Sequence, residues 1–183
     1  MDFKYNFLAV LDDNYFQDNA PKYANLIESY AQIIWYRIKN KNFNIENIKS
    51  VRKAVTKCPL VISCEYNIAL KYGYDGVHLN THCLRNYNII RNSTNLIIGY
   101  SCHTTQELEL INGDYYTLSP VYNTPKEYKV NPIGMVNYNK DKKVFGLGGI
   151  NLDNMANVCN HYYGVAGIRV IEEIVNKYNG YDV

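Results

Sequence analysis

The sequence FGLGGIN at Phe145–Asn151 is an apolar run that ends in glycines just before a predicted helix. The sequence GVAGI at Gly164–Ile168 repeats this arrangement and is followed by a predicted helix that begins near Val170. Glycines let backbone N–H groups approach an anion, and a helix N-terminus adds a favourable dipole. The alternative is that these glycines only form tight turns. Their position at the last two predicted strands favours a phosphate site, because barrels of alternating strands and helices commonly bind phosphate there.

Six more apolar runs precede these two along the chain. Each is short and consists mainly of Val, Ile, Leu, Tyr or Phe, which is typical of parallel strands that are buried on both faces. The eight predicted strands are Phe7–Leu11, Ile33–Ile38, Leu60–Ser63, Gly76–Leu79, Leu96–Ser101, Asp114–Ser119, Val144–Gly149 and Gly164–Ile168.

Helical patterns of apolar spacing lie between the predicted strands. They cover Tyr23–Ala31, Ile45–Val55, Tyr66–Tyr72, Thr105–Ile111, Leu152–Cys159 and Val170–Tyr178, with the weakest pattern at His82–Asn92. Strands that alternate with helices, without a repeat or a linker, indicate an α/β fold. We predict a compact (β/α)₈ TIM barrel that forms a single domain over residues 1–183. The alternative is an open doubly wound sheet, but no GxGxxG motif follows the first strand.

A chain of 183 residues is short for such a barrel, which typically needs about 200–250 residues. Some loops or helices must therefore be trimmed. The net charge of +2 gives no strong field for nucleic acid or an acidic membrane. No apolar run approaches the ~18–20 residues of a membrane span. We therefore expect small-molecule ligands rather than nucleic acid or membrane, and the sequence leaves the oligomeric state open, a homo-oligomer included.

The cysteines are five in number and form no CxxC pair; they are Cys58, Cys64, Cys83, Cys102 and Cys159. The start of the chain, MDFKYNFLAVLDD, turns acidic where a secretory signal would have a long apolar stretch. We therefore predict reduced thiols and a cytoplasmic protein.

Several segments resemble the thiamine phosphate synthase/TenI (thiazole tautomerase) family in order and spacing. They are DGVHL at Asp75–Leu79, GYSCHT at Gly99–Thr104 with Glu107 after it, GDYY at Gly113–Tyr116, SPVYNTPK at Ser119–Lys126, PIG at Pro132–Gly134, GGIN at Gly148–Asn151 and the segment Gly164–Ile174. No single segment is very specific, but together they run in register from about Asp75 to Ile174.

The resemblance implies a reaction that joins an aminopyrimidine diphosphate to a thiazole phosphate and releases pyrophosphate. Such a reaction needs cations on the leaving group, Mg²⁺ among them, and little acid–base machinery. Arg37 and Lys39 match the family's diphosphate-binding residues on the second strand, with Ser101 near the diphosphate. Without the resemblance, Arg37 and Lys39 would be interpreted as a solvated strand end.

Further ligand contacts are implied by the same resemblance. Thr124 and Lys126 would close over the diphosphate. The thiazole phosphate would be held by Gly148, Gly149 and Gly167. His103 is another candidate ligand-binding residue, and the alternative is a neutral His103 that holds loops together through hydrogen bonds.

Three positions depart from the family pattern. Cys64 and Cys83 stand where the family has the aspartates that bind Mg²⁺, and a thiol is a poor ligand for this hard cation. Trp35 stands where a glutamine faces the pyrimidine. The sequence therefore predicts no metal site of the family type and makes the Mg²⁺ cofactor doubtful.

A thiophilic metal site is a separate hypothesis, because Cys64, Cys83 and Cys102 would lie near His82 and His103. The alternative is that these cysteines are small buried apolar residues. For the function, we expect a synthase of thiamine biosynthesis that is impaired by the missing aspartates. The alternatives are a non-catalytic thiazole-phosphate-binding paralogue and a TenI-like tautomerase, although the family's tautomerase histidine is replaced by Pro120.

Overall fold

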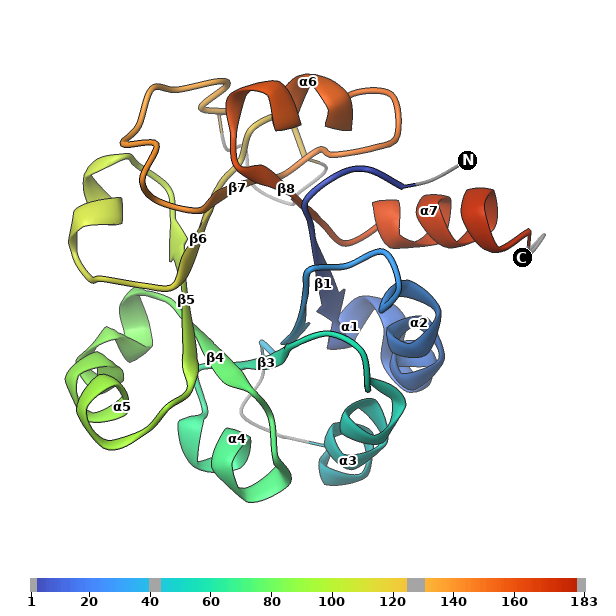
Figure 1. Ribbon diagram of the computed structural model, residues 1–183, viewed down its shortest axis with the longest axis vertical. Helices are drawn as coiled ribbons and strands as arrows, with labels where there is room; N and C mark the ends of the chain where they lie inside the picture. The colour runs from blue at the N-terminus through green and yellow to red at the C-terminus, as the bar shows by residue number, and fades with distance from the viewer. Residues whose placement is uncertain (1–2, 40–43, 125–130, 181–183) are drawn as a thin grey trace.

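The computed structural model describes residues 3–39, 44–124 and 131–180. Its strands form a closed parallel barrel in chain order, in which β8 pairs with β1 (Figure 1). The strands are β1 (Phe7–Asp12), β2 (Ile33–Arg37), β3 (Leu60–Ser63), β4 (Gly76–Leu79), β5 (Ile97–Cys102), β6 (Tyr115–Leu118), β7 (Val144–Leu147) and β8 (Gly164–Gly167). The predicted (β/α)₈ barrel is therefore confirmed, and the open sheet is excluded.

Helices form an outer ring around the barrel (Figure 1). They are α1 (Asp13–Phe16), α2 (Ala20–Ile27), α3 (Ile45–Ala54), α4 (Tyr66–Tyr72), α5 (Tyr87–Ser93), α6 (Met155–His161) and α7 (Val170–Asn179), together with the 3₁₀ helices η1 (Gln17–Asn19), η2 (Thr81–Asn86) and η3 (Gln106–Glu109). None of the described helices is long and apolar enough to cross a membrane.

Short connections explain how a chain of this length closes a barrel. The helix predicted over Thr105–Ile111 is only the 3₁₀ turn η3. The described parts of the connection between β6 and β7 contain no helix. The weak helical pattern at His82–Asn92 is split between η2 and α5.

The alternation of side chains along each strand separates two apolar clusters. Phe7, Ala9 and Leu11 of β1 pack outward against the helices. Leu8 and Val10 point into the barrel and contact an inner cluster that is completed by Trp35, Val61, Tyr115, Phe145 and Ala166. Both faces of the strands are thus buried, which is why the strands appear in the sequence as continuous apolar runs.

Candidate functional site

Three charged side chains meet at the carboxyl ends of β1 and β2. Asp12 ends β1 and is the register partner of Arg37, the last residue of β2. The Arg37 Nη1 lies 2.5 Å from Asp12 Oδ2, and the Lys39 Nζ lies 3.4 Å from the same oxygen. The Asp12 side chain is 3% exposed, whereas those of Arg37 and Lys39 are 31% and 47% exposed. One buried carboxylate therefore holds two cations whose outer parts face solvent.

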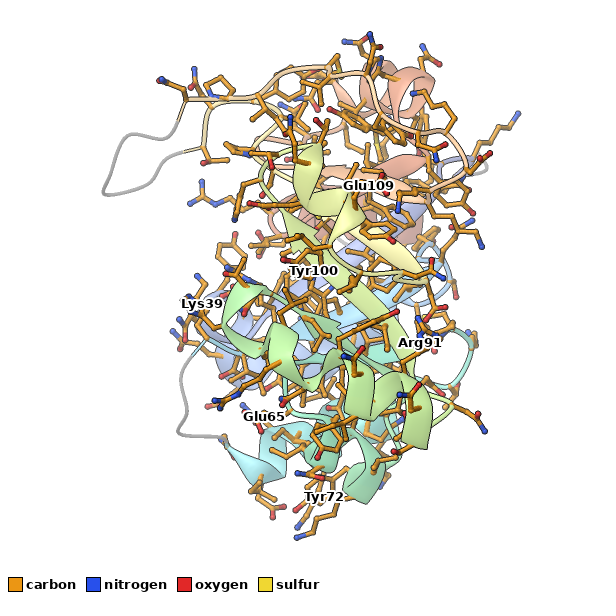
Figure 2. The ribbon with its side chains drawn as sticks, turned by 90° about the vertical axis from the view of Figure 1, so that its left-hand side faces the viewer. Lys39, Glu65, Tyr72, Arg91, Tyr100 and Glu109 are labelled. Atoms are coloured by element: carbon orange, nitrogen blue, oxygen red, sulfur yellow. A yellow bond between two sulfur atoms is a disulfide. The ribbon has the colours of Figure 1, made fainter. Side chains whose placement is uncertain are left out.

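Arg37 and Lys39 were predicted from the sequence, but Asp12 was not. An acidic residue at the end of an apolar run was the only signal, and only the register of β1 against β2 shows its partner. Figure 2 shows Lys39 on one side of the molecule and Arg91, near the amino ends of the strands, on the other. Lys39 thus lies at the carboxyl end of the barrel, as does Arg37, the last residue of β2. Such folds bind their ligands at this end.

A hydrogen-bonded network fills the barrel beneath this charged group. The Trp35 indole stacks on the His78 ring with 3.7 Å between centroids. His78 Nδ1 lies 2.9 Å from the Tyr115 hydroxyl, and its Nε2 lies 2.9 Å from Ser101 Oγ. A neutral imidazole has one N–H and one bare nitrogen, so one of these hydroxyls donates to the ring and the other accepts from it.

Burial sets the protonation states of His78 and Tyr115 in this network. His78 is 1% exposed. The loss of solvation lowers the pKa of His78 well below its usual value, and the Arg37 charge adds to this effect. Burial likewise raises the pKa of the Tyr115 hydroxyl well above its usual value. His78 and Tyr115 are therefore neutral near pH 7 and orient Ser101.

The carboxyl-end opening of the barrel, at which Asp12, Arg37 and Lys39 meet, is called the mouth, and Trp35 lies at its base. It is 5% exposed, and its Nε1 donates to Ser63 Oγ at 3.0 Å. The same Ser63 oxygen accepts from the backbone N–H of Ile38 at 3.2 Å. Because the one polar hydrogen of Trp35 is already bonded, the indole presents no free donor to a ligand here. Ser63 and Tyr115 were missed by the sequence analysis, because only the barrel register brings them to Trp35 and His78.

The glycine loops after β7 and β8 adjoin one another. Gly148 and Gly149 have φ values of +105° and +68°, so they end β7 two residues before the predicted strand end. A Cβ at Gly149 would meet the backbone oxygen of Asn123 at 2.7 Å. A Cβ at Gly167 would lie 3.8 Å from the Cβ of Ile150. Gly148 and Gly149 therefore allow the turn its positive φ values. The absence of side chains also lets the loops after β7 and β8 approach each other near the start of α7.

The remaining predicted site residues differ in what surrounds them. His103 Nδ1 donates to the carbonyl oxygen of Ser119 at 2.9 Å, which ties the end of β5 to the end of β6. This contact is the loop-holding arrangement that was the alternative for His103. Thr124 is half-buried in the loop after β6. Lys126 lies outside the described residues.

Cys64 and Cys83 form a disulfide between the segments that follow β3 and β4. The prediction that all five thiols are reduced is therefore wrong for this pair, because the register of β3 and β4 brings their Cα atoms to 5.8 Å. The other three cysteines are free thiols. Burial raises the pKa of the Cys102 thiol to about 12. With Cys64 and Cys83 bonded to each other, the thiolates required by the soft-metal hypothesis are not available.

The same disulfide bears on whether the Mg²⁺ implied by the resemblance could bind at these two positions. Mg²⁺ needs several hard oxygen ligands in octahedral geometry, and a disulfide offers none. In the described part of the chain, no three His, Cys, Asp or Glu side chains are placed to hold a metal ion. The donor set at Cys64 and Cys83 does not fit Mg²⁺.

A cavity of about 460 Å³ lies at the opposite end of the barrel. Its lining includes Gln32, Asp114 and Lys143, each of which precedes a strand. Neither the glycine loops nor Arg37 contributes to it. We therefore place the candidate site at the carboxyl ends of the strands, where the charged group and the glycine loops are found.

Comparison with known proteins finds relatives over most of the chain. Residues 7–174 match the family described as thiamine monophosphate synthase. A putative thiamine-phosphate synthase 2 of Aquifex aeolicus is 33% identical over 127 residues, which cover 64% of this chain and 68% of that protein. The thiamine-phosphate synthase of Methanococcus maripaludis is 26% identical, and the match covers 96% of this chain and 89% of the relative.

Solved structures show the same fold. Thiamine phosphate pyrophosphorylase from Pyrococcus furiosus superposes with a TM-score of 0.74 at 22% identity, over 97% of this chain and 95% of the other. The N-(5'-phosphoribosyl)anthranilate isomerase of the same organism superposes with a TM-score of 0.63 at 8% identity, over 97% of this chain and all of the other. The fold is thus also found in a protein with a different name, so the fold alone does not identify the family. The match over residues 7–174 does: this chain belongs to the thiamine monophosphate synthase family.

Proposed function

We propose that this chain joins an aminopyrimidine diphosphate to a thiazole phosphate at the carboxyl end of the barrel and releases pyrophosphate. The observation that carries the proposal is the pair of cations, Arg37 and Lys39, held at the mouth by the buried Asp12. Two cations beside one carboxylate leave a net charge of +1, which attracts a polyanion. The carboxylate also fixes the direction of both side chains before the ligand arrives.

The proposed reaction is an ionisation followed by capture. The bond between the pyrimidine methylene carbon and the diphosphate oxygen breaks, and its electron pair leaves with the diphosphate. Arg37 and Lys39 stabilise the negative charge that develops on the leaving group. The thiazole nitrogen then donates its lone pair to the pyrimidine cation. No protein base is needed for these steps, in keeping with the neutral His78.

Other residues take supporting parts in this proposal. Ser101, which His78 orients, lies beside the diphosphate. Gly148, Gly149 and Gly167 bind the thiazole phosphate through backbone N–H groups. Thr124 and Lys126 close over the diphosphate, and His103 holds the loops after β5 and β6 in place for the ligand.

A binding protein without catalysis is the second candidate, and two observations favour it. The Cys64–Cys83 disulfide offers no Mg²⁺ ligand. Trp35, whose Nε1–H is bonded to Ser63, stands where the resemblance places a glutamine that faces the pyrimidine. Such a paralogue would keep the phosphate loops and bind a thiazole phosphate alone.

Calorimetric titration with pyrophosphate and with thiazole phosphate, beside an assay for thiamine phosphate, tests the proposal. The synthase function predicts binding of both ligands and formation of product. We expect Arg37→Gln to weaken pyrophosphate binding by about tenfold, because a hydrogen bond between charged groups is lost. Arg52→Gln, at an ion pair with Asp75 away from Arg37 and Lys39, should leave it unchanged. Thiazole phosphate binding without any product would reject the synthase and support the binding protein. Isomerisation of the thiazole phosphate alone would support a tautomerase instead.

A further inference from the structure

The Cys64–Cys83 disulfide joins two neighbouring strand ends at the mouth of the site. Cys64 directly follows β3, and Cys83 lies in η2, just after β4. The backbone N–H of Cys64 donates to the carbonyl oxygen of His78 in β4 at 3.0 Å. The disulfide thus adds a covalent link where the ladder between the two strands ends.

The backbone at Cys64 adopts a conformation that needs support. Its φ of +53° lies in the left-handed region, which residues other than glycine rarely enter. Such backbone persists only where surrounding contacts hold it. The bond to Cys83 supplies one such contact, because Cys83 is itself fixed in η2 by Asn80, whose backbone N–H donates to Cys83 Sγ at 3.3 Å.

A short chain of contacts leads from the disulfide to the two cations. Ser63, the residue before Cys64, accepts hydrogen bonds from Trp35 Nε1 and from the backbone N–H of Ile38. Ile38 lies between Arg37 and Lys39 in the sequence. Ser63 therefore contacts the backbone that carries both cations, and it lies directly beside Cys64 at the end of β3.

We propose that Cys64 and Cys83 form a site of reversible thiol–disulfide exchange whose oxidation state controls the affinity of the mouth for a diphosphate. The proposal rests on the function proposed above for Arg37 and Lys39. Cys64 is partly exposed and Cys83 is buried, so an incoming thiolate reaches Cys64 first.

The exchange uses a dithiol reductant. One thiolate of the reductant attacks a sulfur of the disulfide, the Cys64–Cys83 bond breaks, and a mixed disulfide forms. The second thiolate of the reductant then attacks the reductant's own sulfur in the mixed disulfide, and the cysteine still bound there leaves as a thiolate. Two electrons and two protons pass to the protein, which gains two thiols, while the reductant becomes a disulfide.

Reduction releases Cys64 from Cys83 and lets the segment after β3 relax. Ser63 then holds the backbone at Ile38 less firmly, so part of the order that Asp12 gives to Arg37 and Lys39 is lost and must be regained when the diphosphate binds. Ordering one or two side chains at that moment weakens affinity by about three- to tenfold. Mg²⁺ does not restore the lost affinity, because it prefers hard oxygen ligands and sulfur is a poor ligand for it in either oxidation state.

The test begins with a count of thiols in the full-length protein. Alkylation under denaturing conditions, followed by mass spectrometry, should label three cysteines in protein exposed to oxidised glutathione. It should label all five after the folded protein has been incubated with dithiothreitol. Five labelled cysteines after both treatments would overturn the proposal.

Calorimetric titration of both forms with pyrophosphate then measures the coupling. We expect pyrophosphate to bind the oxidised protein about three- to tenfold more tightly than the reduced protein. The Cys64→Ser/Cys83→Ser variant should bind like the reduced protein whether or not dithiothreitol is present. The control variant Cys58→Ser/Cys159→Ser keeps the disulfide and should keep the full redox response.

The outcomes separate this inference from the proposed function. Equal pyrophosphate affinity in both oxidation states of the wild-type protein would overturn the redox control and leave the diphosphate site intact. No pyrophosphate binding in either state would overturn the diphosphate site and the redox control together. The wild-type comparison decides the matter even if the serine variant does not fold.

Discussion

The carboxylate of Asp12 and the guanidinium of Arg37 face each other across the β1–β2 pair, with 2.5 Å between Oδ2 and Nη1. Their strands place them side by side, since Asp12 is the register partner of Arg37. The carboxylate also accepts from the backbone N–H of Tyr15 through Oδ1, which fixes its orientation. A buried anion that is held from two sides can aim a cation at a ligand without a large cost in side-chain entropy.

Asp12→Asn should therefore affect both stability and binding. We expect the free energy of unfolding in urea to fall by about 1–3 kcal/mol, because charge-assisted hydrogen bonds to a buried carboxylate are lost. Pyrophosphate affinity should fall as well, since Arg37 and Lys39 lose the group that orients them. Glu46→Gln removes the exposed ion pair with Lys49 and should cost no more than about 0.5 kcal/mol. Undiminished pyrophosphate affinity in Asp12→Asn would mean that the carboxylate does not orient the cations.

Gly149→Ala should show how much the loop after β7 depends on having no Cβ at this position. Gly149 and Gly73 have nearly equal φ values of +68° and +71°, but only Gly149 has neighbours in the space of a Cβ. Gly73→Ala should cost about 1–2 kcal/mol for the left-handed backbone alone. Gly149→Ala should cost about 1–3 kcal/mol more, because its Cβ would meet the Asn123 carbonyl oxygen.

Binding of inorganic phosphate distinguishes the two glycine variants further. Gly149→Ala should weaken it, whereas Gly73→Ala, at the end of α4, should leave it unchanged. Equal phosphate affinity in the two variants would place the phosphate elsewhere. Thermal unfolding and calorimetry of both proteins provide the two measurements.

Stability should depend on pH through His78. Burial lowers the pKa of His78 in the folded state, so the unfolded chain binds the proton more readily. The contribution is fully present above the unfolded pKa of about 6.5 and is lost progressively as the pH falls below it. Between pH 7 and pH 5.5, the free energy of unfolding should fall by about 1 kcal/mol from this group.

Urea unfolding of His78→Gln checks the source of this pH dependence. The slope between pH 5.5 and pH 7 should flatten in His78→Gln, because the glutamine does not titrate. His82→Gln replaces an exposed histidine and should retain the wild-type slope. If both variants kept the slope, another group would be responsible.

Mg²⁺ dependence should be restored by Cys64→Asp/Cys83→Asp. This change replaces the disulfide with two carboxylates at the positions that the resemblance assigns to Mg²⁺ ligands, and oxygen ligands suit Mg²⁺. We expect saturable activation of thiamine phosphate formation by Mg²⁺ in this variant. Cys64→Ser/Cys83→Ser removes the same disulfide without adding a carboxylate and should show no such activation. The prediction is wrong if the wild-type protein shows the same saturable activation.

The sequence alone determined the fold and the order of its parts. Strands buried on both faces of a parallel barrel must be apolar throughout, so all eight appear as short apolar runs. Gly148 and Gly149 were visible as glycines at the end of an apolar run, but the predicted strand ran through both, and only their positive φ values show that β7 ends at Leu147. The sequence also shows Arg37 and Lys39 as two charges at a strand end, and their assignment to a diphosphate came from the resemblance to the family.

Only the tertiary structure decided how these residues meet. Asp12 and Arg37 lie far apart along the chain, and Cys64 is 19 residues from Cys83. Each pair is joined by the register of neighbouring strands, which the sequence does not display. The neutral state of His78 likewise follows from its burial among Trp35, Tyr115 and Ser101. Contacts between strands are set by the closure of the whole barrel, so the charge and the covalent links of the site become visible only when the barrel is formed.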